Sequence, residues 1–209
     1  MRAFIFDLDG VLVFTDKYHY LAWKQVADEL GIYFDEIINN RLRGVSRMES
    51  LEIILERYEG SPLSRSDKEK VAEKKNEIYR KSLAEMTPND VTEETRNTLI
   101  ELKNRGYKLA IGSSSKNAKF ILERVGLTQY FDAISDGTNI TKSKPDPEVY
   151  LKAAEFLGEE ASECVVVEDA YSGIDAAKSA GMEAIGIGDA YSYDRADYRI
   201  SLFSELLEI

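Results

Sequence analysis

The chain has one cysteine among 209 residues, so it cannot form an internal disulfide. Cys164 lies in a valine-rich run, where we expect a small core side chain in a reducing compartment. No apolar stretch approaches the length of a membrane span, and the first residues enter a predicted strand without a signal-peptide pattern. We therefore expect a cytoplasmic protein with no membrane partner.

Positive charge is also scarce. The chain has 27 Lys and Arg against 38 Asp and Glu, and its formal net charge is −11. A field of this sign repels polyphosphates, which argues against nucleic acid or an anionic membrane as partner. Any phosphate site must therefore be local. With 44% hydrophobic and 31% charged residues, the composition is that of a globular protein with one core, or a core plus a smaller domain.

Residues 4–12 form the most informative segment, because a short apolar run ends in two carboxylates one residue apart. Side chains alternate along an extended segment, so Asp7 and Asp9 are expected to point the same way, and Gly10 lets the backbone turn. Two clustered carboxylates are unfavourable unless a metal or a proton lies between them. The alternative is a strand that ends in a solvated Asp-Gly turn.

Two patterns divide the rest of the chain. Residues 14–91 are predicted to form helices. The first helix ends before Gly31 and has Trp23, Val26, Ala27 and Leu30 on one face. The second helix begins with a capping box at Ser46 and Glu49, with an apolar face of Met48, Leu51, Leu55 and Tyr58, and the third helix spans 67–83. After that segment, predicted strands at 107–113, 133–135, 164–168 and 183–187 alternate with helices that begin near Thr92, Ser115, Asp146-Pro147 and Ser172.

This alternation predicts an α/β fold. The first strand would be isolated unless it joined the parallel sheet of the second half. We therefore predict a Rossmann-like parallel-sheet core domain, residues 1–13 plus 92–209, with an inserted α-helical cap domain, residues 14–91.

Polar side chains gather where the predicted strands end, the edge at which open α/β sheets bind ligands. They are Asp7 and Asp9, the run 112–117, the pair Glu168-Asp169, and Lys144 in a loop before a helix. Acids with a hydroxyl and a lysine suit Mg²⁺ and a phosphoryl group. Taken singly, each has a commoner interpretation: Lys144 as a solvated loop residue, the serine run as a helix start, and Glu168-Asp169 as a helix cap.

With these motifs the chain resembles the haloacid dehalogenase superfamily of phosphotransferases. The resemblance rests on Asp7-Leu8-Asp9-Gly10-Val11-Leu12, Ser113, Lys144 and Glu168-Asp169, in this order. Within the superfamily it is similar to hexose-phosphate mutases, through Thr15, His19, Trp23, residues 42–47, Ser50, Lys75-Asn76 and Ser115-Lys116-Asn117. The chain departs from the family pattern at the hinges, with Phe14 and Glu93-Glu94.

The resemblance implies roles for the site residues. Asp7 would be the nucleophile that becomes an aspartyl phosphate, and Asp9 the general acid and base. Ser113 and Lys144 would bind the phosphoryl oxygens, and Thr15 and His19 would complete the catalytic set. Mg²⁺ would be bound by Asp7, Asp9, Glu168 and Asp169. The substrate would be contacted by Trp23, Gly44, Val45, Ser46, Arg47, Ser50, Lys75, Asn76, Ser114, Ser115, Lys116 and Asn117.

Three of these residues also have structural interpretations. Arg47 falls in the first turn of a helix, where the dipole disfavours a cation, so an anionic partner is expected, but a solvated surface arginine is the alternative. A lone histidine such as His19 is more often structural than catalytic. Lys75 shares a helical face with apolar residues and is expected either at an apolar interface or snorkelling to solvent.

The expected function is interconversion of β-D-glucose 1-phosphate and glucose 6-phosphate through a β-glucose 1,6-bisphosphate intermediate, by a monomer. The main alternative is a sugar-phosphate phosphatase, which needs only one phosphate site. A dehalogenase would need neither Asp9 nor a metal. A non-catalytic sugar-phosphate sensor would not need the intact acids and Lys144.

Overall fold

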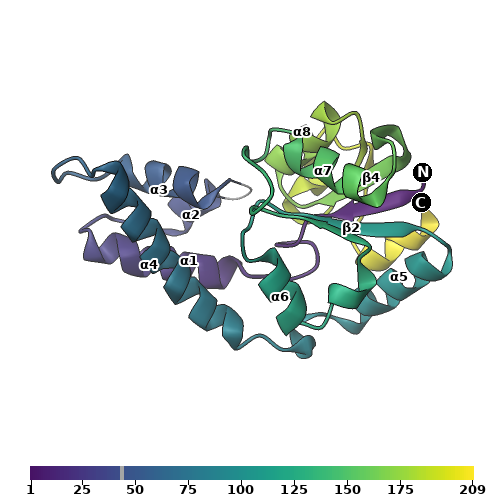
Figure 1. Cartoon of the computed structure of the whole chain (residues 1–209), viewed down its shortest axis with the longest axis horizontal. Coiled ribbons are helices and arrows are strands. Elements are labelled where there is room, and N and C mark those ends of the chain that lie inside the picture. The colour runs from purple at the N-terminus through teal and green to yellow at the C-terminus, as the bar shows by residue number, and fades with distance from the viewer. Residues whose placement is uncertain (43–44) are drawn as a thin grey trace. The chain divides into compact units, whose positions relative to one another are not determined.

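Six parallel strands form one sheet in the computed structural model, which describes residues 1–42 and 45–209. Their order is β3-β2-β1-β4-β5-β6, so the first strand of the chain lies in the middle of the sheet (Figure 1). The predicted parallel-sheet core is thus confirmed. The strands are β1 (Ala3–Phe6), β2 (Lys108–Gly112), β3 (Ala133–Ser135), β4 (Cys164–Glu168), β5 (Glu183–Gly186) and β6 (Tyr198–Arg199).

Helices cover both faces of this sheet, with α7 and α8 on one face and α5 on the other (Figure 1). Glycines with positive φ follow several of them, including Gly158, a left-handed C-cap with φ 68°. The helices of this unit are α5 (Glu93–Asn104), α6 (Ala118–Arg124), α7 (Glu148–Leu157) and α8 (Tyr171–Ser179), with short 3₁₀ turns η1 (Pro88–Asp90), η2 (Thr128–Tyr130), η3 (Ala161–Glu163), η4 (Gly188–Ser192) and η5 (Phe203–Glu208).

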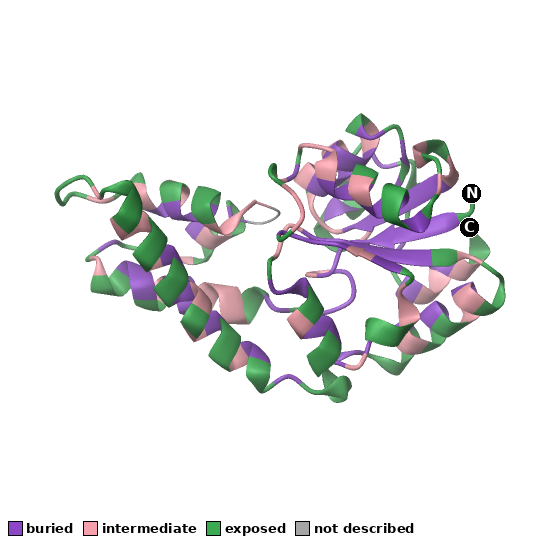
Figure 2. Cartoon of the chain, viewed as in Figure 1, coloured by how far each residue is buried: buried purple, intermediate pink, exposed green. Residues whose placement is uncertain are grey.

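All residues of strand β1 are buried (Figure 2). The residues on its two faces differ in character. Its even positions are aromatic: Phe4 packs edge-on against Tyr107 and Phe6 packs against Phe203, at centroid distances of 5.1 and 5.7 Å. Its odd positions, Ala3 and Ile5, join an alanine-rich cluster that includes Ala153 and Ala154 of α7 and Ala176 and Ala177 of α8. Small residues on these helices let them pack closely against the sheet. Helices α7 and α8 follow β3 and β4 in the chain, so their N-termini lie toward the carboxyl ends of the strands.

Residues Thr15–Glu85 form a second, helical unit. It contains α1 (Asp16–Glu29), α2 (Glu36–Asn40), α3 (Arg47–Leu55) and α4 (Arg65–Ala84). Its core includes Trp23, Ala27, Phe34, Leu51 and Ile54. The capping box predicted at Ser46 and Glu49 is present, with the Glu49 N–H donating to Ser46 Oγ and the Ser46 N–H to the Glu49 carboxylate.

Some local predictions were wrong. Met48 is 37% exposed, and Ile54, which was not predicted, is buried with Leu51. Tyr58 packs against the core of the helical unit as expected, but it lies beyond the end of α3. The two-residue strand β6 and the short helix α2 were not predicted, since neither is long enough for a periodic pattern. Over the described residues, no helix combines the length and apolar character that a membrane crossing requires.

The larger unit comprises Met1–Phe14 and Met86–Ile209, whereas the sequence analysis put the second boundary at 91/92. The intervening segment is held by side chains of the larger unit. Arg124 donates to the Met86 carbonyl and Arg96 to the Pro88 carbonyl, at 2.9 and 2.7 Å. These hydrogen bonds explain why residues 86–91, which precede helix α5, belong to the larger unit.

Candidate active site

The site begins where β1 and β4 end side by side. Phe6 pairs with Val167 in parallel register, and the Asp7 N–H donates to the Val167 carbonyl at 3.0 Å. This pairing brings Asp7 level with Glu168, the last residue of β4. One carboxylate oxygen each of Asp7, Glu168 and Asp169 lies within 4.8 Å of the others. Three acids that are distant in sequence therefore form one cluster.

Lys144 lies inside this acidic cluster. Its Nζ is 2.5 Å from both Asp7 Oδ1 and Glu168 Oε1, and its side chain is only 1% exposed. Burial raises the pKa of Asp7 to about 7, although Lys144 lowers it. Burial alone would lower the pKa of Lys144, but the two carboxylates outweigh this effect and hold it above its ordinary value. The solvated-loop interpretation of Lys144 is therefore wrong.

The segment after β1 is a turn rather than a continuation of the strand. The strand ends at Phe6, so Asp7 and Asp9 do not share a face through strand alternation as expected. Gly10 has φ 93°, and a Cβ built at this position would overlap the Asp169 carboxylate. Only a glycine lets the turn approach Asp169 so closely. Asp9 lies in this turn, close enough to Asp7 for its charge to raise the pKa of Asp7 further.

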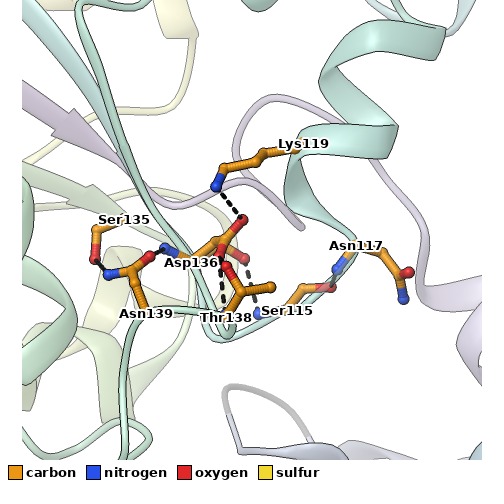
Figure 3. Close-up of polar contacts among 8 residues, drawn as sticks. Ser115, Asn117, Lys119, Ser135, Asp136, Thr138 and Asn139 are labelled. Atoms are coloured by element: carbon orange, nitrogen blue, oxygen red, sulfur yellow. Dashed lines mark hydrogen bonds and ion pairs between the residues drawn. The ribbon is translucent and has the colours of Figure 1, made fainter.

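The loop after β2 carries the predicted phosphate-binding residues. Ser113 is buried, and its Oγ accepts the Ser115 N–H at 3.2 Å. Ser115 Oγ in turn accepts the Asn117 N–H at 3.1 Å (Figure 3). Helix α6 begins only at Ala118, so the polar run forms a hydroxyl-lined loop rather than the helix start that the sequence favoured. In this loop Lys116 is exposed and Ser114 is half-buried.

A second loop, after β3, supports this one (Figure 3). Asp136 is fully buried, and its Oδ1 accepts the Thr138 N–H at 2.8 Å. The Gly137 N–H donates to the Ser115 carbonyl at 3.2 Å. A Cβ at Gly137 would lie 2.5 Å from a backbone oxygen of the loop after β2. The two backbones therefore touch, and the loop after β3 supports the loop after β2.

The helical unit contains its own buried polar cluster. Lys75 Nζ lies 2.9 Å from His19 Nδ1 and over the rings of Trp23 and Tyr79, 5.1 and 4.3 Å from their centroids. Because an ammonium can only donate, Nδ1 accepts and the imidazole is neutral. Burial holds the pKa of His19 well below its usual range, and the positive charges of Lys75 and Arg47 lower it further. Tyr79 Oη donates to Thr15 at 3.1 Å. Lys75 is thus buried and does not snorkel.

Arg47 occupies the first turn of α3 and is partly buried. Its side chain is 22% exposed, and Nη1 lies 3.5 Å from Glu73 Oε2. Burial lowers its pKa, an effect that Glu73 opposes. Ser50 is buried one turn further along the same helix, whereas Val45, Ser46 and Asn76 are half-buried. Gly44, also predicted to contact the substrate, lies outside the described residues.

The donor set of the acidic cluster suits a hard divalent cation. Asp7, Glu168 and Asp169 offer only carboxylate oxygens, which are the ligands that Mg²⁺ prefers. Glu168 is held in place by three donors: Lys144 and the Tyr150 hydroxyl at Oε1, and the Ala170 N–H at Oε2. The cluster could therefore hold Mg²⁺.

Sequence reasoning missed Tyr150 and the Asp136–Gly137 loop. Tyr150 appeared as one more apolar residue of a helix, and its hydroxyl contact crosses between elements. Burial keeps the pKa of Tyr150 well above its usual value, so the phenol retains its proton and donates. Two glycines that touch side chains of this region, Gly112 and Gly173, were the available signals. Neither stands in a recognisable motif.

Comparison with known proteins identifies a family, and its identity agrees with the acids, lysine and hydroxyls found at the site. The model of the haloacid dehalogenase-like hydrolases matches residues 1–181. The chain belongs to this family. The resemblance inferred from the motifs is thereby confirmed, and the Rossmann-like core with a helical insertion is the family's fold.

Several relatives in the haloacid dehalogenase-like family are similar over nearly the whole chain. Beta-phosphoglucomutase of Bacillus subtilis is 41% identical over 208 residues, covering 99% of this chain and 92% of that protein. A phosphorylated carbohydrates phosphatase of Thermotoga maritima is 36% identical over 187 residues, covering 88% and 84%. The crystal structure of beta-phosphoglucomutase from Clostridium difficile has a TM-score of 0.92 at 38% identity and covers 99% and 93% of the two chains.

Proposed function

We propose that the protein is a β-phosphoglucomutase, which interconverts β-D-glucose 1-phosphate and β-D-glucose 6-phosphate through β-glucose 1,6-bisphosphate. The observation that carries this proposal is the 41% identity to the Bacillus subtilis enzyme over 99% of the chain, since it extends through the helical unit as well as the core. The likeness to the Thermotoga maritima phosphatase covers 88% of the chain at lower identity.

In the first half-reaction Asp7 attacks the phosphorus of a sugar bisphosphate. A bond forms between the Asp7 carboxylate and phosphorus while the bond from phosphorus to the sugar oxygen breaks, and Asp9 gives its proton to that oxygen. In the second, the sugar hydroxyl loses its proton to Asp9 and takes the phosphoryl group from Asp7. The Lys144 ammonium supports this chemistry, because it opposes the rise in the pKa of Asp7 that burial causes and so favours the ionised nucleophile.

The phosphoryl oxygens carry charge throughout the transfer and need fixed donors. In this proposal Ser113 and Lys144 bind them, supported by the hydroxyl-lined loop after β2. Mg²⁺, when bound by Asp7, Glu168, Asp169 and the Asp9 carbonyl, supplies Lewis-acid stabilisation of the same charge. Ser114, Ser115, Lys116 and Asn117 provide further donors to the substrate.

A mutase also needs a site for the phosphate that is not being transferred. We assign this role to Arg47, because it is a partly buried cation with one long contact to Glu73. In this proposal residues 15–85 act as the cap that excludes water, with Ser50, Asn76, Trp23, Val45 and Ser46 contacting the substrate. Thr15, His19 and Lys75 maintain the cap through their buried contacts.

A coupled assay tests the proposal. Glucose 6-phosphate formation from β-glucose 1-phosphate is followed with and without added bisphosphate, and inorganic phosphate release is measured in parallel. Isomerisation that depends on bisphosphate and far exceeds phosphate release is expected. Phosphate release equal to substrate loss would instead support the sugar-phosphate phosphatase. The proposed monomeric state is checked by size-exclusion chromatography with light scattering, and the proposed cytoplasmic location by cell fractionation.

A further inference from the structure

Tyr150, on helix α7, contacts two charged groups of the site, Glu168 and Lys144. Its side chain is fully buried, and Oη donates to Glu168 Oε1 at 2.8 Å. Its ring lies beneath the Lys144 ammonium, with Nζ 4.9 Å from the ring centroid. A single side chain thus contacts both partners of the buried ion pair, through the hydroxyl and the aromatic face respectively.

Two glycines leave the space that these contacts occupy. A Cβ at Gly112, the last residue of β2, would lie 2.7 Å from the Tyr150 ring. A Cβ at Gly173, in the first turn of α8, would overlap the Glu168 carboxylate. Both distances are below those found for real side chains, so a larger residue at either position would displace Tyr150 or Glu168. The local backbone is therefore adapted to this pair.

The Tyr150 hydroxyl completes the hydrogen bonding of the Glu168 carboxylate. Oε2 accepts the Ala170 N–H at 2.8 Å, and Oε1 accepts from Tyr150 and from Lys144. Lys144 is shared with Asp7, at the same distance of 2.5 Å. Without the Tyr150 hydroxyl, Oε1 would keep only the bond from Lys144, which Asp7 also attracts. The Ala170 N–H would still hold Oε2, but the position of Oε1 would depend on Lys144.

We propose that Tyr150 is a positioning residue for the cation site, which holds the Glu168 carboxylate in the orientation that a divalent metal requires. The inference rests on the proposed metal-dependent function. Tyr150 acts through Glu168 and has no contact with the reacting atoms in this scheme. Hydrogen-bond partners of metal ligands typically change metal affinity or activity by about 10 to 100-fold when removed.

The test is Tyr150→Phe, which removes the hydroxyl and keeps the ring under Lys144. Isothermal titration of Mg²⁺ into the metal-free full-length protein should show a dissociation constant raised by about 10 to 100-fold. In turnover, the apparent activation constant for Mg²⁺ should rise, while KM for the sugar phosphate at saturating Mg²⁺ should not. Tyr193→Phe is the matched control, since its hydroxyl also donates to a carboxylate, Asp175 Oδ1 at 2.9 Å, outside the acidic cluster.

Equal Mg²⁺ affinity in wild type and Tyr150→Phe would overturn the inference, even if the variant melted at a lower temperature, since that pattern indicates a purely structural role. Such a result would leave the wild-type mutase activity, and hence the proposed function, intact. A loss of Mg²⁺ affinity of the same size in Tyr193→Phe would also overturn it, because the effect would then follow from any lost tyrosine hydroxyl.

Discussion

Replacing Lys144 by methionine removes one charge and nearly preserves the size of the side chain. Its Nζ lies 2.5 Å from carboxylate oxygens of both Asp7 and Glu168, at 1% side-chain exposure. The variant leaves these buried acids without their shared cation. Because removing one partner of a buried ion pair costs about 3 to 5 kcal/mol, the free energy of unfolding at pH 8 in EDTA should fall by this amount.

Differential scanning calorimetry measures this loss. For a chain of this length about 1 kcal/mol corresponds to roughly 2 to 4 °C, so the melting temperature in EDTA should fall by roughly 6 to 20 °C. Added Mg²⁺ should raise the melting temperature of Lys144→Met more than that of wild type, because no internal cation competes for the acids.

Lys103→Met is the control for the loss of a lysine charge. Lys103 Nζ lies 2.6 Å from Asp132 Oδ1, but its side chain is 34% exposed. Its removal should therefore cost less than about 1 kcal/mol. Equal melting temperatures of Lys144→Met and Lys103→Met in EDTA would refute the electrostatic reasoning.

Four further predictions concern the two units. Asp7→Asn should abolish phosphoryl transfer and leave the circular dichroism spectrum unchanged, because an amide of equal volume is not a nucleophile; mutase turnover in this variant would contradict its role. Arg47→Ala should lower the ratio of mutase turnover to aspartyl-phosphate hydrolysis at least about tenfold, since a lost desolvated charge contact costs about 2 to 5 kcal/mol; an unchanged ratio would favour the phosphatase. His19 is the only histidine, and burial with two neighbouring cations lowers its pKa, so its imidazole NMR signal should not titrate near pH 6.5 in the folded protein. The unfolded chain binds that proton below about pH 6.5 and the folded one does not, so stability should fall as the pH drops below this value; a folded-state titration near pH 6.5 would disprove the buried neutral imidazole. Gly137→Ala should raise KM for the sugar phosphate, because its Cβ would lie 2.5 Å from a backbone oxygen of the phosphate-binding loop; unchanged kinetics would show that this loop tolerates the shift.

Much of the fold could be predicted from the sequence because its core strands are buried on both faces. The run Cys164–Glu168 was predicted with its observed bounds, since four buried apolar residues before Glu168 leave a continuous apolar signal. Capping residues located helix starts equally well, as at Ser46. Strand β6 escaped prediction because both of its residues, Tyr198 and Arg199, are exposed at the edge of the sheet.

The acids of the site could be predicted because parallel strands end at the same edge, and the family resemblance added Lys144 to them. The buried contacts of the two lysines could not be predicted. Nothing in the sequence distinguishes Lys144 from a solvated loop residue, since its burial results from carboxylates on two other elements. Lys75 is similar: a neutral histidine nitrogen and two aromatic faces hold its ammonium inside the helical unit. Such contacts join segments far apart in sequence, and a local pattern carries no information about them.

The central position of β1 has a consequence for the order of folding during synthesis. The first strand to leave the ribosome pairs with β2, which begins at Lys108, and with β4, which begins at Cys164. The apolar residues of β1 therefore stay unpaired until most of the chain has been synthesised. Residues 15–85 form a separate compact unit and can fold earlier. Strand β1 is short and apolar, so in the nascent chain it stays exposed for longer than any other strand of the sheet.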